Sequence, residues 1–155
     1  MAISRDEFME ILEGNRRLTI RTIEAFPEDQ LFQYKPVETL RPFSKMAIEI
    51  LTVERAYMRG IALDEWDFSN PFEEISTKED LLTAYEDARE ETRELWSTVT
   101  EETLATKKDD PFFGLGSQSH MERLQYALEN EIHHRGQGYI YLRMLGIEPP
   151  AFYIR

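Results

Sequence analysis

The chain has 155 residues, 41% of them hydrophobic, and a formal net charge of -12 from 30 acidic and 18 basic side chains. This length favours a single domain over residues 1–155, and the acidic balance argues against binding to nucleic acid, because phosphate contacts need a basic surface. The sequence contains no cysteine, which excludes disulfides, zinc ribbons and thiol nucleophiles.

The first residues, Met-Ala-Ile-Ser-Arg-Asp-Glu, are too charged for a signal peptide. No apolar run approaches the roughly 18 residues that a membrane-spanning helix needs. We therefore expect a soluble, cytoplasmic protein with no membrane partner.

The first two expected helices lie on either side of a proline-rich connection. Ser4 and Glu7 form a capping box, and apolar residues then recur at helical spacing, which predicts a helix over about 4–25. A second helix should follow Pro42, with Ser44 as its cap, and continue to Ile61. This helix is apolar on nearly all sides, which is typical of a buried helix.

The second half of the chain gives two more helical patterns. Thr77, with Asp80 three residues later, predicts a third helix that extends to about residue 99 and has an acidic, solvated face. Residues 100–110 favour a short turn of helix, and a glycine-broken apolar loop then leads into a fourth helix that ends near Gly146. The apolar tail after Pro149 should dock on the body of the protein or on a partner chain.

These patterns predict an all-α fold, an antiparallel four-helix bundle. An up-down-up-down order is the default, although the connection over about 63–76 is long enough to span a face of the bundle. Bundles place metal and ligand sites between facing helices, so the polar residues that interrupt the apolar stripes are the candidates for a site.

The fourth helix carries the richest polar stretch, residues 129–137. A step of about 100° per residue places His134, Glu131 and Asn130 in or beside the inward stripe, whereas His133 points away. Two interpretations remain open. His134 with Glu131 or Asn130 forms part of a site, or Glu131 pairs with Arg135 while His134 donates a hydrogen bond to a neighbouring helix.

The second helix contributes two carboxylates, Glu49 and Glu54, within its apolar surface. A buried carboxylate must be paired, protonated or bound to a metal ion. An arginine partner for Glu54 would come from Arg135, Arg55 or Arg143. Glu131 and His134 have the Glu-x-x-His spacing of di-iron bundles, but the second helix has Thr52 where the second histidine is required, which argues against that site.

Aromatic residues gather in the two long connections. Trp66 and Phe68 follow the second helix, and Phe112 and Phe113 precede the fourth. We expect these four side chains to frame a pocket for a small apolar ligand.

Two stretches resemble the DinB/YfiT-like family. They are residues 43–55, on the second helix, and the run His133-His134-Arg135-Gly136-Gln137 with Tyr141 to Gly146 and Pro149-Pro150. The resemblance implies a four-helix bundle that is often a homodimer. In many members it implies a divalent metal ion held by three histidines, and some relatives are S-transferases or isomerases that use a low-molecular-weight thiol.

This sequence departs from that triad, because Glu49 and Asn130 stand at two of its positions and only His134 keeps the histidine. Glu49, Asn130, Glu131 and His134 are the candidate ligands for zinc, nickel or manganese, with Glu54, His133 and Arg135 around them. The first hypothesis is a metal-dependent enzyme of the thiol S-transferase or hydrolase type. The second is a metal-free bundle that binds a small ligand or a partner protein.

Overall fold

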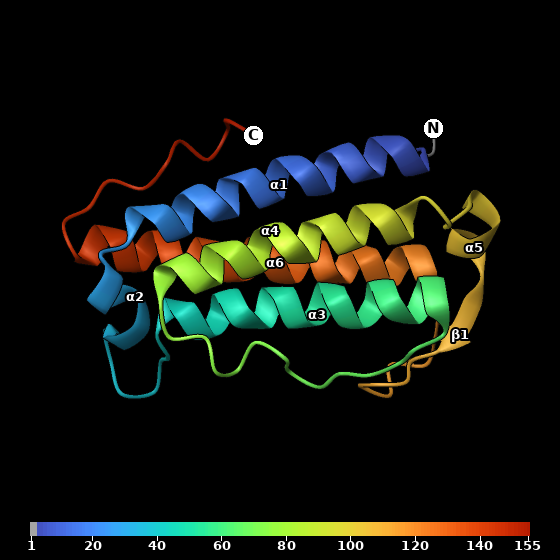
Figure 1. Cartoon of the computed structure of the whole chain (residues 1–155), viewed down its shortest axis with the longest axis horizontal. Coiled ribbons are helices and arrows are strands. Elements are labelled where there is room, and N and C mark those ends of the chain that lie inside the picture. Colours follow the sequence, from blue (N-terminus) through green and yellow to red (C-terminus); the bar gives the residue numbers. More distant parts are fainter. Residues whose placement is uncertain (1–2) are drawn as a thin grey trace.

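The computed structural model describes residues 3–155, and residues 1 and 2 of the expected 1–155 domain lie outside the described residues. The elements are α1 (Arg5–Ala25), α2 (Glu28–Gln33), α3 (Phe43–Leu63), α4 (Lys78–Trp96), α5 (Glu101–Ala105), β1 (Lys107–Asp109), β2 (Ser117–Ser119) and α6 (His120–Met144) (Figure 1). The long helices α1, α3, α4 and α6 form the expected bundle.

The helices do not follow the default up-down-up-down order. Residues 64–77, which we call the crossover, run back along the bundle, so that α3 and α4 point in the same direction (Figure 1). Fourteen extended residues reach about 46 Å, whereas a helix of the length of α3 spans about 31 Å. The crossover therefore spans a face of the bundle, as its length allowed.

Local capping sets where most of the long helices begin. Ser4 and Glu7 form the expected capping box of α1, and the Thr77 side chain accepts the backbone N–H of Asp80 at the start of α4. The expectation that Ser44 caps α3 is wrong, because Pro42 is the N-cap and the helix begins at Phe43. The Phe43 ring stacks on Phe26 with centroids 4.9 Å apart, which holds this first turn in the core.

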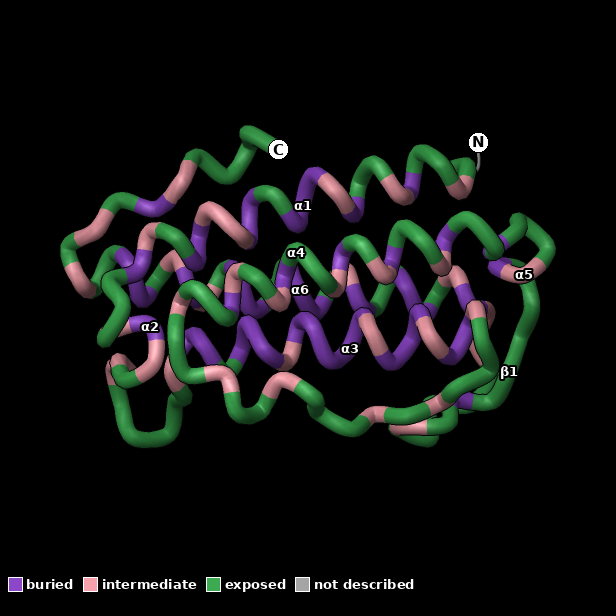
Figure 2. The backbone as a smooth tube through the Cα atoms, in the orientation of Figure 1, coloured by how far each residue is buried: buried purple, intermediate pink, exposed green. Residues whose placement is uncertain are grey.

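The core consists of two apolar clusters, one toward each end of the bundle. α3 is buried on nearly all sides, as its sequence predicts (Figure 2). The clusters are separated near the middle of the bundle by a layer of buried charged side chains, one from each long helix. This polar layer comprises Arg16, Glu54, Arg89 and Glu131.

The segment before α6 contains the expected short turn of helix within 100–110 and, after it, a hairpin that the sequence did not predict. Only residues 101–105 are helical, and β1 then pairs antiparallel with β2 in the register Lys107↔Ser119 and Asp109↔Ser117. The expected apolar loop is the tip of this hairpin. The intervening Asp110 accepts backbone N–H groups from Phe112 and Phe113 at 3.1 and 2.9 Å, which closes the turn.

The C-terminal tail returns along α1, as expected of a tail that docks on the body of the protein (Figure 1). Arg21 donates a hydrogen bond to the carbonyl oxygen of Ile154. Across residues 3–155, no helix combines the length and the apolar character needed to cross a bilayer.

Candidate functional site

The structure brings Glu49, Asn130 and His134 together between α3 and α6. The Nε2 atom of His134 lies 2.9 Å from Oε1 of Glu49, and the Nδ2 atom of Asn130 donates to the same oxygen at 3.2 Å. Asn130 and His134 are one helical turn apart and therefore share the face of α6 that meets α3. The alternative in which His134 bonds to a neighbouring helix is thus present in the structure.

Arg41, just before α3, completes what we call the Glu49 cluster: Glu49, Asn130, His134 and Arg41. Its Nη2 atom lies 2.5 Å from Oε2 of Glu49. Partial burial would raise the pKa of Glu49, but the hydrogen bonds from His134, Arg41 and Asn130 outweigh it and lower the pKa below the ordinary value. The carboxylate is therefore ionised and holds a positive or hydrogen-bonding partner on each oxygen.

Glu131, the fourth candidate ligand, lies away from the Glu49 cluster. Its Oε1 atom accepts from Nε of Arg16 at 3.1 Å and from Oγ1 of Thr19 at 2.6 Å, both on α1. Adjacent residues on a helix point about 100° apart, so Asn130 faces α3 while Glu131 faces α1. A shift of one residue along α6 does not bring Glu131 to His134.

Glu54 is paired with arginines, which is one of the three states expected of a buried carboxylate. Its Oε2 atom accepts from Arg16 and, at 3.1 Å, from Arg89, and its Oε1 atom accepts from Thr92 at 2.8 Å. Burial would raise the pKa of Glu54, but the two guanidinium groups outweigh it and lower the pKa. The partners differ from the expected ones, which were Arg135, Arg55 and Arg143.

The two other residues expected around the site do not touch Glu49. His133 is exposed, and its ring centroid lies 5.1 Å from that of His134. Arg135 is buried and donates to the Asn15 carbonyl oxygen at 3.0 Å and to the Asn15 side chain at 2.9 Å, so the expected pair with Glu131 does not form. Arg135 therefore ties α6 to α1.

The Glu49 cluster does not fit a divalent metal ion in this arrangement. Zinc, nickel and manganese sites combine several imidazole or carboxylate ligands, and residues 3–155 contain no group of three or more His, Asp or Glu side chains arranged so that it could hold a metal ion. A cation between Glu49 and His134 would also have to break the hydrogen bond that joins them. One feature favours a cation: the Oδ1 atom of Asn130 is buried and accepts no hydrogen bond within the described residues.

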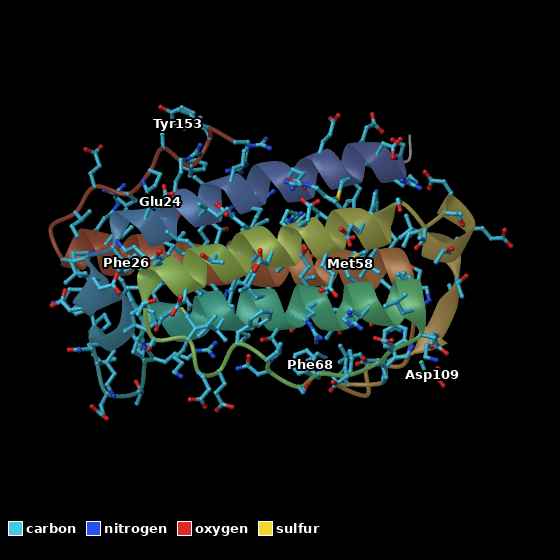
Figure 3. All side chains as sticks on the ribbon, in the orientation of Figure 1. Glu24, Phe26, Met58, Phe68, Asp109 and Tyr153 are labelled. Atoms are coloured by element: carbon cyan, nitrogen blue, oxygen red, sulfur yellow. The ribbon has the colours of Figure 1, made fainter. Side chains whose placement is uncertain are left out.

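The four expected aromatic residues form one cluster between the crossover and the hairpin. The Phe68 ring centroid lies 5.1 Å from Phe112 and 5.5 Å from Phe113, and Trp66 lies 6.1 Å from Phe112. Figure 3 places Phe68 on the crossover beside α3. The four aromatic side chains therefore lie together as expected, but only two of them line a cleft.

A cleft of about 400 Å³, which we call the α3 cleft, lies between α3, the crossover and the hairpin. Phe68 and Phe113 line it, whereas Trp66 and Phe112 pack behind them. Glu49 and Arg41 stand at its polar end. The other lining residues are Lys45, Ile48, Thr52, Val53, Asn70, Glu73 and Tyr126.

Sequence reasoning missed Arg41, Lys45 and Tyr126 in this site. Arg41 lies just before α3 and Lys45 lies in its first turn, and neither carries a periodic signal. Tyr126 precedes Asn130 by one helical turn and could have been placed on the same face of α6. The amide Oε1 of Gln137 lies 2.9 Å from Nδ1 of His134. Both ring nitrogens of His134 are therefore engaged.

Comparison with known proteins gives consistent matches. The sequence model of the DinB family matches residues 1–155. The uncharacterized protein YjoA of Bacillus subtilis (strain 168) is 30% identical over 142 residues, which cover 90% of each chain.

Two crystal structures resemble the whole bundle. The DinB-like protein YjoA of Bacillus subtilis superposes with a TM-score of 0.77 at 28% identity, over 95% of this chain and 98% of that one. A DinB-like protein of Bacillus cereus ATCC 10987 gives a TM-score of 0.81 at 19% identity, over 99% and 100%, and this second match supports the fold alone.

Proposed function

The chain belongs to the DinB family, and from that premise we propose that it binds a small amphipathic molecule in the α3 cleft. The observation that carries the proposal is the division of the cleft into two ends. Arg41, Lys45 and Glu49 form a charged end, and Phe68 with Phe113 forms an aromatic end. Ligand pockets commonly combine an apolar wall with a few convergent polar groups.

The charged end favours a ligand with an acidic group next to its apolar part. Lys45 is exposed in the first turn of α3, and Arg41 lies just before it, where the positive end of the helix dipole also favours an anion. The carboxylate of Glu49 is held by His134 and Asn130, so it is fixed in place as an acceptor for a donor group on the same ligand.

Anilinonaphthalene sulfonate, an aromatic anion, tests this proposal by fluorescence titration. We expect saturable binding of one molecule per chain at low salt. Lys45→Glu and Phe113→Ala change exposed side chains at the two ends of the cleft, and each should weaken binding by about fivefold or more. Lys107→Glu, on β1, makes the same charge reversal outside the cleft and should leave the dissociation constant unchanged.

A second apolar depression requires its own control. Ile3, Phe8, Ile11, Met121 and Leu128 line a hollow between α1 and α6 that could also attract the probe. Ile11→Asp should therefore have no effect if the probe occupies the α3 cleft. Loss of binding in Ile11→Asp, with Lys45→Glu unchanged, would refute the proposal.

The competing function is a metal-dependent enzyme of the thiol S-transferase or hydrolase type. It is favoured by the convergence of Glu49, Asn130 and His134 and by the buried, unpartnered Oδ1 of Asn130. Elemental analysis of untagged protein after incubation with zinc, nickel and manganese separates the two functions. Stoichiometric metal that is lost in His134→Ala would support the enzyme, and its absence would leave the ligand-binding function.

A homodimer, expected from the family resemblance, is part of this proposal. Ile132, Ile140 and Met144 are exposed at spacings of eight and four along α6, with Gly136 between them. Such a stripe gives a second chain an apolar surface and, at the glycine, a close approach. Sedimentation of the protein should show a dimer that Ile140→Asp dissociates.

A further inference from the structure

The polar layer, counted together with the adjacent buried Arg135, holds more positive than negative charge. Arg16, Arg89 and Arg135 are 1%, 3% and 5% exposed, whereas only two carboxylates, Glu54 at 6% and Glu131 at 2%, are buried beside them. The buried set therefore has an excess of one positive charge. Buried charges are normally paired because the loss of hydration is costly.

Several guanidinium N–H groups in this layer have no acceptor. They are Nη1 of Arg16 and both Nε and Nη1 of Arg89, which are buried and unpartnered within the described residues. Burial lowers the pKa of Arg89, and the neighbouring Arg16 lowers it further, against the opposing effect of Glu54. These donors are the kind that an oxyanion satisfies, because a guanidinium group presents its N–H bonds as a planar fork.

The unpartnered donors belong to side chains that line a second cleft of about 420 Å³ between α1 and α4, which we call the arginine cleft. α1 packs less extensively on α4 than on α6, which leaves room between the two helices. Arg16 and Arg89 form its inner end, and Ile20 and the Tyr85 ring give it an apolar wall. It is separate from the α3 cleft, which shares none of its lining residues.

Glu13 also lines the arginine cleft, next to Arg89. Arg93 holds its carboxylate at 2.9 and 3.0 Å, and Oε1 of Glu13 lies 3.9 Å from Nη1 of Arg89, too far for a hydrogen bond. The carboxylate therefore stands in front of Arg89 without satisfying it.

From these contacts we propose that the arginine cleft binds the phosphate or carboxylate group of a small molecule. The oxyanion accepts hydrogen bonds from Arg89 and Arg16, and Glu13 moves aside with Arg93 to admit it. Glu13 thus competes with the ligand for the same guanidinium group. The binding site differs in position and in chemistry from the α3 cleft and does not depend on the function proposed there.

The rim limits the affinity. Glu86, Asp87 and Glu90 also line the cleft, and all three are exposed. Solvent screens exposed carboxylates much more than it screens the buried guanidinium groups, so the inner end attracts an anion despite the acidic rim. A simple anion without further contacts should bind weakly, in the millimolar range.

Side-chain Nε–Hε resonances in an NMR titration with inorganic phosphate provide the test. Among the residues that the structure describes, the Nε–H of Arg89 finds no acceptor, whereas that of Arg16 already donates to Glu131 at 3.1 Å. We expect the Arg89 resonance to shift downfield, and the shift should saturate as phosphate is added. The shift should exceed the one that sodium chloride causes at equal ionic strength. Acetate in place of phosphate distinguishes a preference for carboxylate from one for phosphate.

Two matched variants make the test specific. Glu13→Gln removes the competing charge and should tighten phosphate binding by about threefold or more. Glu10→Gln makes the same change one turn earlier on α1, outside the arginine cleft, and should alter the dissociation constant little. Both variants change side chains near the surface, so the fold should persist, which the amide spectrum verifies.

Three outcomes would overturn the proposal. They are an Arg89 resonance that does not respond to phosphate or acetate, a response that sodium chloride reproduces, and equal affinities in Glu13→Gln and Glu10→Gln.

Discussion

Replacing Glu54 with glutamine tests whether the polar layer holds the bundle together. The side chain keeps its size in Glu54→Gln, but the charge that faces Arg16 and Arg89 is lost. The new amide N–H₂ also points at a donor, because both carboxylate oxygens accept hydrogen bonds in the protein. The variant therefore leaves two buried guanidinium groups with Glu131 as their remaining buried carboxylate.

The expected loss in the free energy of unfolding is about 3–5 kcal/mol, the usual cost of removing one partner from a buried ion pair. For a chain of this length, each kcal/mol lowers the melting temperature by about 2–4 °C, so Glu54→Gln should melt about 6–20 °C lower. Urea denaturation at neutral pH, followed by far-ultraviolet circular dichroism, measures the change directly. Glu10→Gln, an exposed position on α1, should stay within about 0.5 kcal/mol of the parent protein.

A loss below about 1 kcal/mol in Glu54→Gln, with an unchanged slope of unfolding free energy against urea, would contradict this reasoning. Such a result would mean that water stabilises the two guanidinium groups as effectively as the carboxylate of Glu54 does. The arginine cleft would then have no electrostatic basis, so this stability measurement also bears on the anion site.

Three further predictions concern acid stability, the hairpin and the crossover. The pKa of Glu54 is lowered from 4.5, so the stability that its carboxylate contributes is present above pH 4.5 and is lost as pH falls through the lowered pKa. In Glu54→Gln the free energy of unfolding, measured by circular dichroism, should therefore depend less on pH in the acid range. Asp110→Asn weakens the acceptor that closes the hairpin turn and should cost about 1–3 kcal/mol, with faster hydrogen exchange over residues 107–119 as the readout. A Cβ added at Gly60 would overlap the Trp66 ring, so Gly60→Ala should cost about 1–3 kcal/mol and shift tryptophan fluorescence to the red; an unchanged spectrum would show that the ring is not held there.

The helices were predictable because their signals are local. The Ser4 and Glu7 box and the Thr77 cap lie within four residues of the turns that they stabilise, and the apolar period extends over whole helices. The start of α3 was misplaced by its apparent cap, Ser44. Tertiary packing of Phe43 on Phe26 decided the boundary there, and no local pattern reports such a contact.

The site was predictable only where one helix supplied the spacing. Asn130 and His134 share a face of α6, and a hydrogen bond from His134 to a neighbouring helix was one of the two interpretations of the sequence. The partners of Glu54 were not found, since Arg16 and Arg89 lie 38 and 35 residues away in the chain. A signal existed, because each arginine follows a core residue of its own helix by four positions, Leu12 and Tyr85 respectively.

The crossover also determines how the bundle can assemble during folding. Within residues 3–155, the extensive contacts between long helices join α3 to α4 and α6, and α1 to α4 and α6. The two long helices before the crossover, α1 and α3, therefore sit across a diagonal from each other, and so do α4 and α6 after it. Neither half of the chain contains a packed pair of long helices, so neither offers a stable intermediate, and the protein should fold and exchange its core amide hydrogens as one cooperative unit.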